Sequence, residues 1–184
     1  MKNTYKLEIG DLERELPIVK ISDEKTSPYL IILGDMELVN KCATELVKII
    51  PKVDYLVTAE TRGIPLVHEM ARQLNMKRYI VARKNIKCYR NEPISASVIS
   101  IRNNDTCSLF LNKEDEKLLK DKNVLLVDDI ISTGDSMKEM EALVKVSGAN
   151  VIGKAAILVD TSREENKDMI YIKELPMFTN VENN

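Results

Sequence analysis

Short apolar runs and helical stripes alternate along most of this chain. Residues 55–59, 78–82, 124–127 and 151–159 are short, mostly apolar and rich in β-branched side chains. Runs of this kind are typical of parallel strands that are covered on both faces. We therefore expect a strand at each of these places.

Helical patterns separate the apolar runs. Residues 36–50 carry apolar side chains at helical spacing, with Asp35 as a candidate N-cap and Pro51 directly after the stripe. Similar stripes follow the runs at 55–59 and 124–127. This alternation predicts an α/β fold built on a doubly wound parallel sheet, in which ligands bind at the carboxyl ends of the strands.

Residues 1–34 stand outside the alternation. They hold two short strand patterns, at 15–21 and 29–33, and both are bounded by turn residues. We expect this segment to form a small N-terminal hood that is added to the main sheet.

Residues 85–112 also interrupt the alternation. The segment is long and polar, with two weakly alternating pieces at 97–101 and 107–111. Because a segment of this length inside a compact domain is usually functional or disordered, we predict a flexible segment that contains a loose hairpin, and we call this segment the flap. A chain of 184 residues has the size of one domain, so we expect residues 1–184 to form a single domain with this hood and flap.

An acidic pair and a small hydroxyl-rich loop follow the apolar run at 124–127. Asp128 and Asp129 come first, where we expect the strand to end, and the loop at residues 132–136 then opens a helical stripe. A loop at a helix N-terminus offers free backbone N–H groups and the positive end of the helix dipole to an anion, and Gly134 allows close approach. Two adjacent carboxylates suit sugar hydroxyls or a divalent cation. The stretch predicts a pocket for a sugar 5-phosphate.

An ordinary strand–loop–helix turn, with its Asp, Ser and Thr residues acting as caps, is the alternative for this stretch. It accounts well for the hydroxyl residues. It accounts poorly for Asp128 beside Asp129, because two carboxylates repel each other when no cation or hydroxyl group lies between them.

A second loop of the same kind follows the run at 55–59. It contains Glu60, Arg62 and Gly63 and opens the next helical stripe, so it predicts a second anion site. Arg62 adds a fixed cation that can grip phosphate oxygens. The alternative is a solvated Glu60–Arg62 pair on the surface. A basic pair, which includes Lys84, leaves the strand predicted at 78–82.

Charge and cysteine usage narrow the class of protein. The net charge of −2 offers no broad basic field for nucleic acid, no apolar run approaches the length of a membrane span, and the N-terminal residues lack the apolar core of a signal peptide. Cys42, Cys88 and Cys107 form no Cys-x-x-Cys pair, so we expect reduced thiols in a cytoplasmic protein. His68 is the only histidine, which leaves little material for His-based metal sites.

The stretch at residues 124–134 resembles the signature of the type I phosphoribosyltransferases, enzymes that use 5-phosphoribosyl-1-pyrophosphate (PRPP). The matching positions are the apolar run, Asp128, Asp129, two further apolar residues and a Thr-Gly pair. The loop at residues 60–63 is similar to that of adenine phosphoribosyltransferases in particular. Asp135 stands where the adenine enzymes usually carry a second glycine, and we interpret it as offering its N–H while its carboxylate turns away.

The resemblance implies a site as well as a fold. Asp128 and Asp129 would be the catalytic residues and would hold the ribose hydroxyls, and Mg²⁺ would be bound mainly through the substrate, with the same two aspartates as candidate ligands. The residues assigned to the 5-phosphate are Ser132, Thr133, Gly134, Asp135 and Ser136. The residues assigned to pyrophosphate are Glu60, Thr61, Arg62, Gly63, Lys84 and Lys87. The implied partners are PRPP, a purine base and a second copy of the chain in a homodimer.

The flap departs from the adenine enzymes, which carry a Glu-Tyr pair there that assists proton transfer at the base. No acidic residue lies between Pro93 and Asn104, and the nearest candidates, Glu92 and Asp105, have no tyrosine after them. We interpret the flap as a clamp that holds pyrophosphate through Lys87 and excludes water. Proton transfer would then fall to solvent or to the hood.

Three alternatives accompany this interpretation. Adenine is the base that the resemblance favours, but the hood carries no base motif, so xanthine, hypoxanthine and guanine stay open. A non-catalytic PRPP-sensing regulator of the same fold is the second alternative, although we find no basic module for nucleic acid. A dinucleotide-binding oxidoreductase would need a Gly-x-Gly-x-x-Gly motif after its first strand, and the chain has none. We therefore expect a purine phosphoribosyltransferase of purine salvage that releases pyrophosphate.

Overall fold

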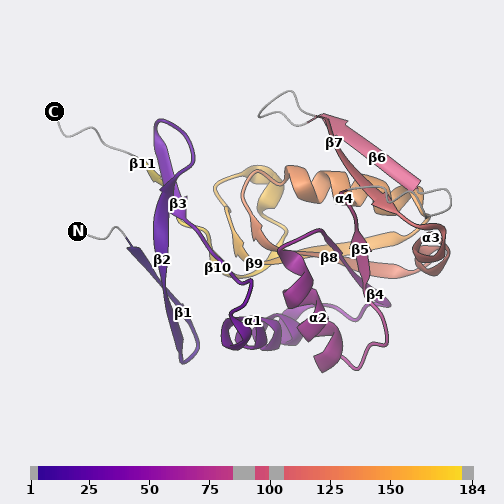
Figure 1. The fold of residues 1–184 in the computed structure, drawn as a ribbon, viewed down its shortest axis with the longest axis horizontal. Coiled ribbons are helices and arrows are strands. Elements are labelled where there is room, and N and C mark those ends of the chain that lie inside the picture. The colour runs from indigo at the N-terminus through magenta and orange to yellow at the C-terminus, as the bar shows by residue number, and fades with distance from the viewer. Residues whose placement is uncertain (1–3, 85–93, 100–105, 180–184) are drawn as a thin grey trace.

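A five-stranded parallel sheet forms the centre of the molecule (Figure 1). The computed structural model describes residues 4–84, 94–99 and 106–179. The strands lie in the order β10-β9-β8-β4-β5, and each neighbouring pair is parallel. Their bounds are β4 Tyr55–Ala59, β5 Ile80–Ala82, β8 Asn123–Ile131, β9 Asn150–Val159 and β10 Ile170–Glu174. The predicted doubly wound α/β sheet is confirmed.

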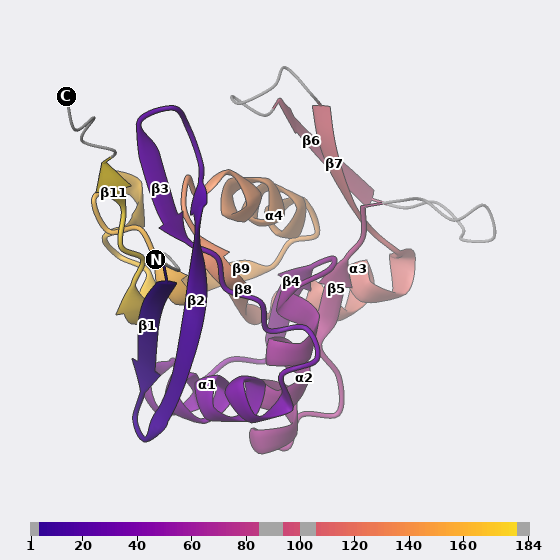
Figure 2. The same ribbon diagram turned by 60° about the vertical axis from the view of Figure 1, so that its left-hand side comes forward.

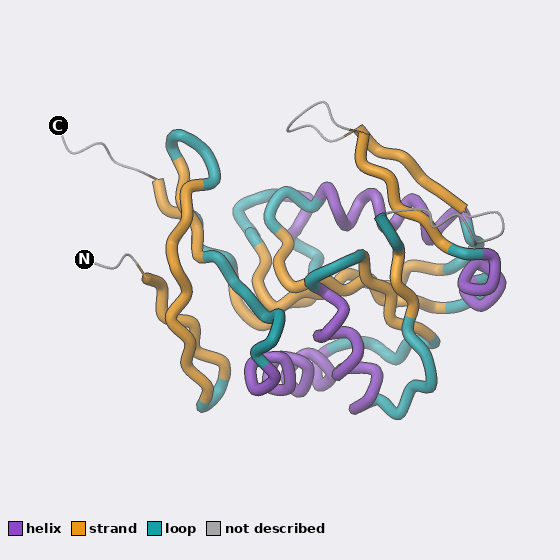
Figure 3. Tube along the Cα trace, in the orientation of Figure 1, coloured by secondary structure: helices purple, strands orange, loops and turns teal. Residues whose placement is uncertain are grey.

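Helices cover both faces of this sheet (Figures 1 and 3). On one face lie α1 (Met36–Ile49) and α2 (Gly63–Gln73), and on the other lies α4 (Asp135–Val146). The short α3 (Lys113–Leu119) packs through its last residue into the same apolar cluster as α4. Alternate residues of β8 point to the two faces, as the pleat of a strand requires.

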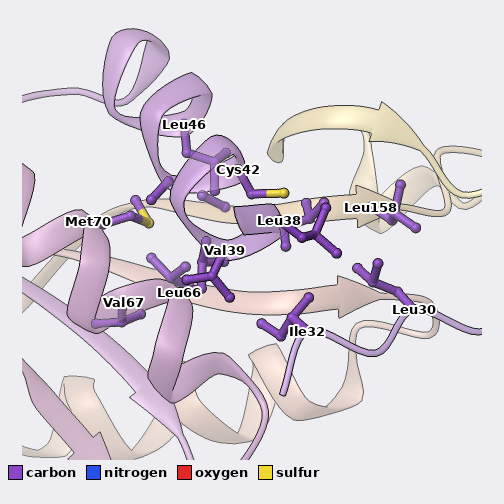
Figure 4. Packing of buried hydrophobic residues seen from close by; sticks show 14 of the residues in the cluster. Leu30, Ile32, Leu38, Val39, Cys42, Leu46, Leu66, Val67, Met70 and Leu158 are labelled. Carbon is purple, nitrogen blue, oxygen red and sulfur yellow. The ribbon is translucent and has the colours of Figure 1, made fainter. Parts of the chain in front are cut away.

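Close packing holds α1 and α2 against the sheet. Leu38, Cys42 and Leu46 of α1 lie with Leu66 and Met70 of α2 in one buried cluster, which Figure 4 shows from close by. The predicted N-cap is also present, because the Asp35 carboxylate accepts a hydrogen bond from the Leu38 N–H at 3.0 Å. The cap fixes where α1 begins, and packing against α1 sets the position of α2, which begins at the second predicted anion loop.

The hood is an antiparallel sheet in the order β1-β2-β3-β11 (Figure 2). Its strands are β1 Thr4–Ile9, β2 Leu12–Lys20, β3 Lys25–Pro28 and β11 Phe178–Thr179. The hood therefore contains residues from both ends of the chain, whereas the sequence predicted only residues 1–34.

The strand predicted at residues 29–33 is wrong. The Tyr29 N–H still donates to the Pro17 carbonyl at 2.8 Å, but β3 ends at Pro28 and the chain leaves the sheet to enter α1. The alternation that suggested a strand is nevertheless real, because Leu30 and Ile32 are fully buried while their neighbours are exposed. Here the alternation comes from an extended loop that lies over the core.

The predicted hairpin within the flap segment is present. Strand β6 (Ile94–Ile99) pairs antiparallel with β7 (Thr106–Leu111), and both lie against α4. Arg83, just after β5, exchanges backbone hydrogen bonds of 2.9 and 2.8 Å with Phe110 of β7, which ties the hairpin to the main sheet. Residues 85–93 and 100–105 lie outside the described residues, so the flexibility of the flap stays a prediction.

Within the described part of the chain, no helix combines the length and the apolar character that crossing a membrane would require.

Candidate active site

The acidic pair lies within β8 rather than after it. The sequence predicted that the strand ends before Asp128, but β8 continues to Ile131 because β9 still pairs with it as far as Ile131 opposite Val159. The other neighbour, β4, pairs with β8 only up to Leu126. Asp128 and Asp129 therefore have a strand partner on one side and the loop before α2 on the other.

The two carboxylates differ in their surroundings. One oxygen of Asp128 accepts a hydrogen bond from the Asp129 N–H at 2.9 Å. Burial, and then the negative charge of Asp129, raise the pKa of Asp128 to about 7. Asp129 is only 1% exposed, and Arg62 Nε lies 3.3 Å from its Oδ2 as an ion pair without hydrogen-bond geometry. The free site therefore holds more negative charge than its own groups compensate.

The loop at residues 132–136 closes a small polar cavity at the N-terminus of α4. The cavity measures about 210 Å³ and is lined by Arg62, Asp128 and residues 130–137. Gly134 has φ +78° and occupies the N-cap position of the helix, where only a residue tolerant of the left-handed region fits without strain. The Ser132 hydroxyl is buried and has no hydrogen-bond partner among the described residues. The geometry offers N–H and O–H donors to an anion.

Asp135 lies in the first turn of α4 with its carboxylate near a cation. Its N–H lies 3.5 Å from the Thr133 hydroxyl oxygen, and its carboxylate lies 3.9 Å from Lys138 Nζ. The neighbouring positive charge reduces the repulsion that this carboxylate would exert on an anion in the loop.

The second predicted loop meets the acidic pair directly. It joins β4 to α2, and a Cβ atom at Gly63 would lie 2.2 Å from Thr58 Oγ1 and 3.3 Å from Asp128 Oδ1. A side chain at this position would push the loop away from β8. The side chain of Arg62 lies over the ring of Tyr29, with its guanidinium carbon 5.8 Å from the centre of that ring. The two loops that the sequence predicted separately thus form one site.

A second cavity of about 310 Å³ adjoins the first. Its lining residues are Ala59, Glu60, Thr61, Arg62, Lys84, Leu109, Asp128, Ser136 and Glu139. The Glu60 carboxylate accepts hydrogen bonds from the Lys84 N–H at 2.9 Å and from Arg83 Nη1 at 3.3 Å. Glu60 therefore contacts the basic residues that follow β5. Lys87 lies outside the described residues, so its predicted role stays a prediction.

Glu139 was missed by sequence reasoning. It is buried and lines the second cavity. The sequence did contain an indication of this position, because Glu139 follows Ser136 by three residues and therefore lies on the same side of α4.

The acidic pair has the donor chemistry that Mg²⁺ prefers. Carboxylate oxygens are hard ligands, and neither oxygen of Asp129 is hydrogen-bonded to a described residue. No cluster of three or more His, Cys, Asp or Glu side chains with metal-site geometry occurs among residues 4–84, 94–99 and 106–179. The carboxylates of Asp128 and Asp129 thus have the chemistry of cation ligands, and Asp128 lines both cavities.

A family model matches most of the chain. The model described as "Phosphoribosyl transferase domain" matches residues 34–183. The chain belongs to the phosphoribosyltransferase domain family. The resemblance that the two motifs indicated is confirmed at this level.

Relatives of this phosphoribosyltransferase domain include a regulator and an enzyme. The probable purine biosynthesis transcriptional regulator PurR of Streptococcus pneumoniae is 27% identical over 132 residues, which are 71% of this chain and 46% of that protein. Xanthine phosphoribosyltransferase of Lactobacillus helveticus is 27% identical over 143 residues, which are 74% of this chain and 71% of the enzyme. The chain spans about half the length of the curated regulators that it matches.

Solved structures show the same fold. Adenine phosphoribosyltransferase of Thermoanaerobacter pseudethanolicus aligns with a TM-score of 0.65 at 23% identity, over 78% of this chain and 84% of that enzyme. At this identity the likeness concerns the fold, which is that of the type I phosphoribosyltransferases.

The close contact at Gly63 gives a testable prediction. Replacing Gly63 by Ala places a methyl group 2.2 Å from Thr58 Oγ1, so we expect the free energy of unfolding to fall by about 1–3 kcal/mol. The double variant Thr58→Ala/Gly63→Ala removes the clashing oxygen and should recover part of that loss. Denaturant unfolding of both variants measures the difference. If the double variant is no more stable than Gly63→Ala, the clash with Thr58 Oγ1 is not the reason why a side chain at position 63 destabilises the protein.

Proposed function

We propose that this chain is a purine phosphoribosyltransferase that transfers ribose 5-phosphate from PRPP to a purine base and releases pyrophosphate. One observation carries the proposal. A helix-N-terminal phosphate loop, an acidic pair of which Asp129 is buried, and an arginine-bearing loop converge at the carboxyl ends of β8 and β4. PRPP carries a phosphate, two sugar hydroxyls and a pyrophosphate, and each of these groups has a chemical counterpart in that site.

Each part of PRPP is assigned to a different element. The loop of Ser132, Thr133, Gly134, Asp135 and Ser136 holds the 5-phosphate. Asp128 and Asp129 accept hydrogen bonds from the ribose hydroxyls. Thr61, Arg62, Gly63 and Lys84 hold pyrophosphate, with Lys87 from the flap. Glu60 contributes indirectly. Its hydrogen bonds to Arg83 and Lys84 keep these two basic residues, which follow β5, beside the cavity.

The reaction needs positioning and charge more than a covalent intermediate. A ring nitrogen of the base forms a bond to C1 of the ribose, and the bond from C1 to the pyrophosphate oxygen breaks, with its electron pair leaving on pyrophosphate. The proton that the base loses passes to solvent or to the hood. The sugar ring is positively charged in the transition state, and the carboxylates of Asp128 and Asp129 would stabilise that charge. When bound, Mg²⁺ would supply positive charge to the leaving pyrophosphate, and Asp128 and Asp129 are the protein residues that would hold it.

Two observations bear on which purine base is used, and they favour different bases. The loop at residues 60–63 favours adenine by its resemblance to the adenine enzymes, whereas one relative in sequence is a xanthine phosphoribosyltransferase. We take adenine as the first candidate and xanthine as the second, with hypoxanthine and guanine after them. We also propose that the protein is a homodimer in the cytoplasm, and sedimentation equilibrium tests its oligomeric state.

A second candidate function is a PRPP-sensing regulator. Its support is the identity of 27% to a probable purine biosynthesis transcriptional regulator. A regulator of this kind would bind PRPP at the same site and would not turn it over.

An assay of pyrophosphate release separates the two candidates. The protein is incubated with PRPP and Mg²⁺ together with adenine, xanthine, hypoxanthine or guanine in turn. We expect release of pyrophosphate that depends on one of these purines and that produces the matching nucleotide in equal amount. Binding of PRPP without release for any base would contradict the enzyme and support the regulator.

The raised pKa of Asp128 predicts how activity depends on pH. Asp128 accepts hydrogen bonds from the sugar more strongly when it is ionised, and its pKa is about 7 in the free protein. We therefore expect kcat/KM for PRPP to rise as the pH increases through about 7. Replacing Asp128 by Asn should lower turnover about 10²-fold and remove this step from the profile. Asp121→Asn is the matched control, because Asp121 lies just before the opposite end of β8, with φ +58°. This variant should leave both the turnover and the pH profile unchanged.

The same pKa shift has an effect on stability that can be checked without substrate. A carboxyl group whose pKa is raised on folding destabilises the fold as the pH rises from its ordinary value of 3.8 through about 7. At pH 8 and without ligand, the Asp128→Asn variant should therefore unfold at a higher temperature than the unchanged protein. Below pH 4 this difference in unfolding temperature should vanish. A variant that is less stable at pH 8 would show that the carboxylate has a structural role instead.

A further inference from the structure

The turn that follows β9 lies against the phosphate loop. Strand β9 ends at Val159, and residues 160–167 then form a turn that contains a short 3₁₀ helix, Glu164–Asn166. The Asp160 N–H donates to the Ile131 carbonyl at 2.8 Å. Its carboxylate is nearly buried and accepts bonds from the Ser162 N–H at 3.1 Å and hydroxyl at 2.6 Å. The turn is therefore rigidly attached to the end of β8, where the loop begins.

Asn166 is the residue of this turn that reaches the loop. Its side chain is fully buried, and its amide nitrogen donates to the Ser132 carbonyl at 2.8 Å and to the Asp160 carbonyl at 2.9 Å. One side chain thus joins the turn to the first residue of the phosphate loop. Asn166 does not line the cavity that the loop closes, so it lies behind the loop.

The amide oxygen of Asn166 also limits the shape of the loop. A Cβ atom at Gly134 would lie 3.0 Å from this oxygen, and the oxygen has no hydrogen-bond partner among the described residues. The side chain therefore occupies the space behind Gly134. A larger residue at either position would push the loop toward the cavity.

The hydrogen bond from Asn166 to the Ser132 carbonyl also fixes the direction of a backbone donor on the opposite side of the loop. In a planar trans peptide the C=O and the following N–H point in opposite directions. Because the Ser132 carbonyl points to Asn166, the N–H of Thr133 points away from Asn166. The donor is thereby oriented before any ligand arrives, and an oriented donor binds an anion without a cost of reorganisation.

Lys138 makes a second, weaker connection between the same two segments. Its Nζ lies 3.6 Å from Glu165 and 3.9 Å from Asp135. Lys138 and Glu165 are exposed and Asp135 is partly exposed, so the connection adds little stability. The main contact is the buried one through Asn166.

We propose that Asn166 is a positioning residue that holds the loop at residues 132–136 in the conformation that binds a sugar phosphate. This proposal rests on the proposed function, because it concerns the same 5-phosphate site. It adds a residue that lies outside both motifs and does not touch the ligand.

The test compares two probes that occupy different parts of the site. Ribose 5-phosphate occupies the loop at residues 132–136, and pyrophosphate occupies the neighbouring cavity. For Asn166→Ala we expect the Kd of ribose 5-phosphate to rise about tenfold, because the loop must then be ordered on binding, while the Kd of pyrophosphate stays unchanged. In kinetics the KM for PRPP should rise more than kcat falls. Asn166→Asp keeps the shape but loses the donor, and should weaken ribose 5-phosphate binding at least as much.

Ser147→Ala is the matched control. Ser147 is also buried and donates to the Val144 carbonyl at 2.6 Å, at the other end of α4. Its loss removes a buried hydrogen bond without touching the loop, so both Kd values should stay unchanged. If Asn166→Ala and Asn166→Asp bind ribose 5-phosphate as the unchanged protein does, or lose both probes equally, the positioning role is overturned while the proposed function stands.

Hydrogen exchange on the unchanged protein tests the same proposal without a variant that must fold. Adding ribose 5-phosphate should increase protection of residues 132–136 and of residues 160–167 together. Protection of the loop without the turn would overturn the proposal. If the unchanged protein binds neither ribose 5-phosphate nor PRPP, the proposed function itself falls.

Discussion

The site depends on two adjacent aspartates that β8 holds in a nearly buried position. Two carboxylates side by side in a strand repel each other, and burial makes that repulsion stronger. The surrounding elements compensate only in part, through Arg62 at 3.3 Å from Asp129 and a hydrogen bond from a backbone N–H to Asp128. Burial, and then the negative charge of Asp129, raise the pKa of Asp128 to about 7. A ligand that brings hydroxyl groups and a cation would relieve this unfavourable state, and such relief favours binding.

The rest of the fold can be understood as support for this arrangement. Packing of α1 and α2 on one face sets the position of the Arg62 loop, and Gly63 allows that loop to touch β8. On the other face, α4 presents its N-terminus to the loop at residues 132–136. The hood and the β6–β7 hairpin are added to opposite ends of this core (Figure 1). Because the anchoring elements are buried and regular, the two loops that carry functional side chains are held in place at both of their ends.

The part of the site that was predictable from sequence is the part encoded in contiguous residues. The acidic pair and the loops at residues 132–136 and 60–63 all follow an apolar run, so they could be recognised directly, and the two loops do lie after strands. The parts that escaped depend on distant pairing. The length of β8 beyond Asp128 is set by β9, and β11 joins the hood only because the chain returns there. Asn166 lies in an irregular turn whose sequence carries no signal for its contact with Ser132.

The central claim is that the acidic pair, the phosphate loop and the Arg62 loop form one PRPP site. Calorimetric titration of the protein with PRPP near pH 7, with and without Mg²⁺ and in two buffers of different ionisation enthalpy, tests this claim most directly. Our account predicts binding that is strengthened by Mg²⁺ and that releases protons, because the ligand lowers the pKa of Asp128 toward its ordinary value. No binding in either condition would contradict the account, and Mg²⁺-independent binding without proton release would show that the aspartates are not part of the site.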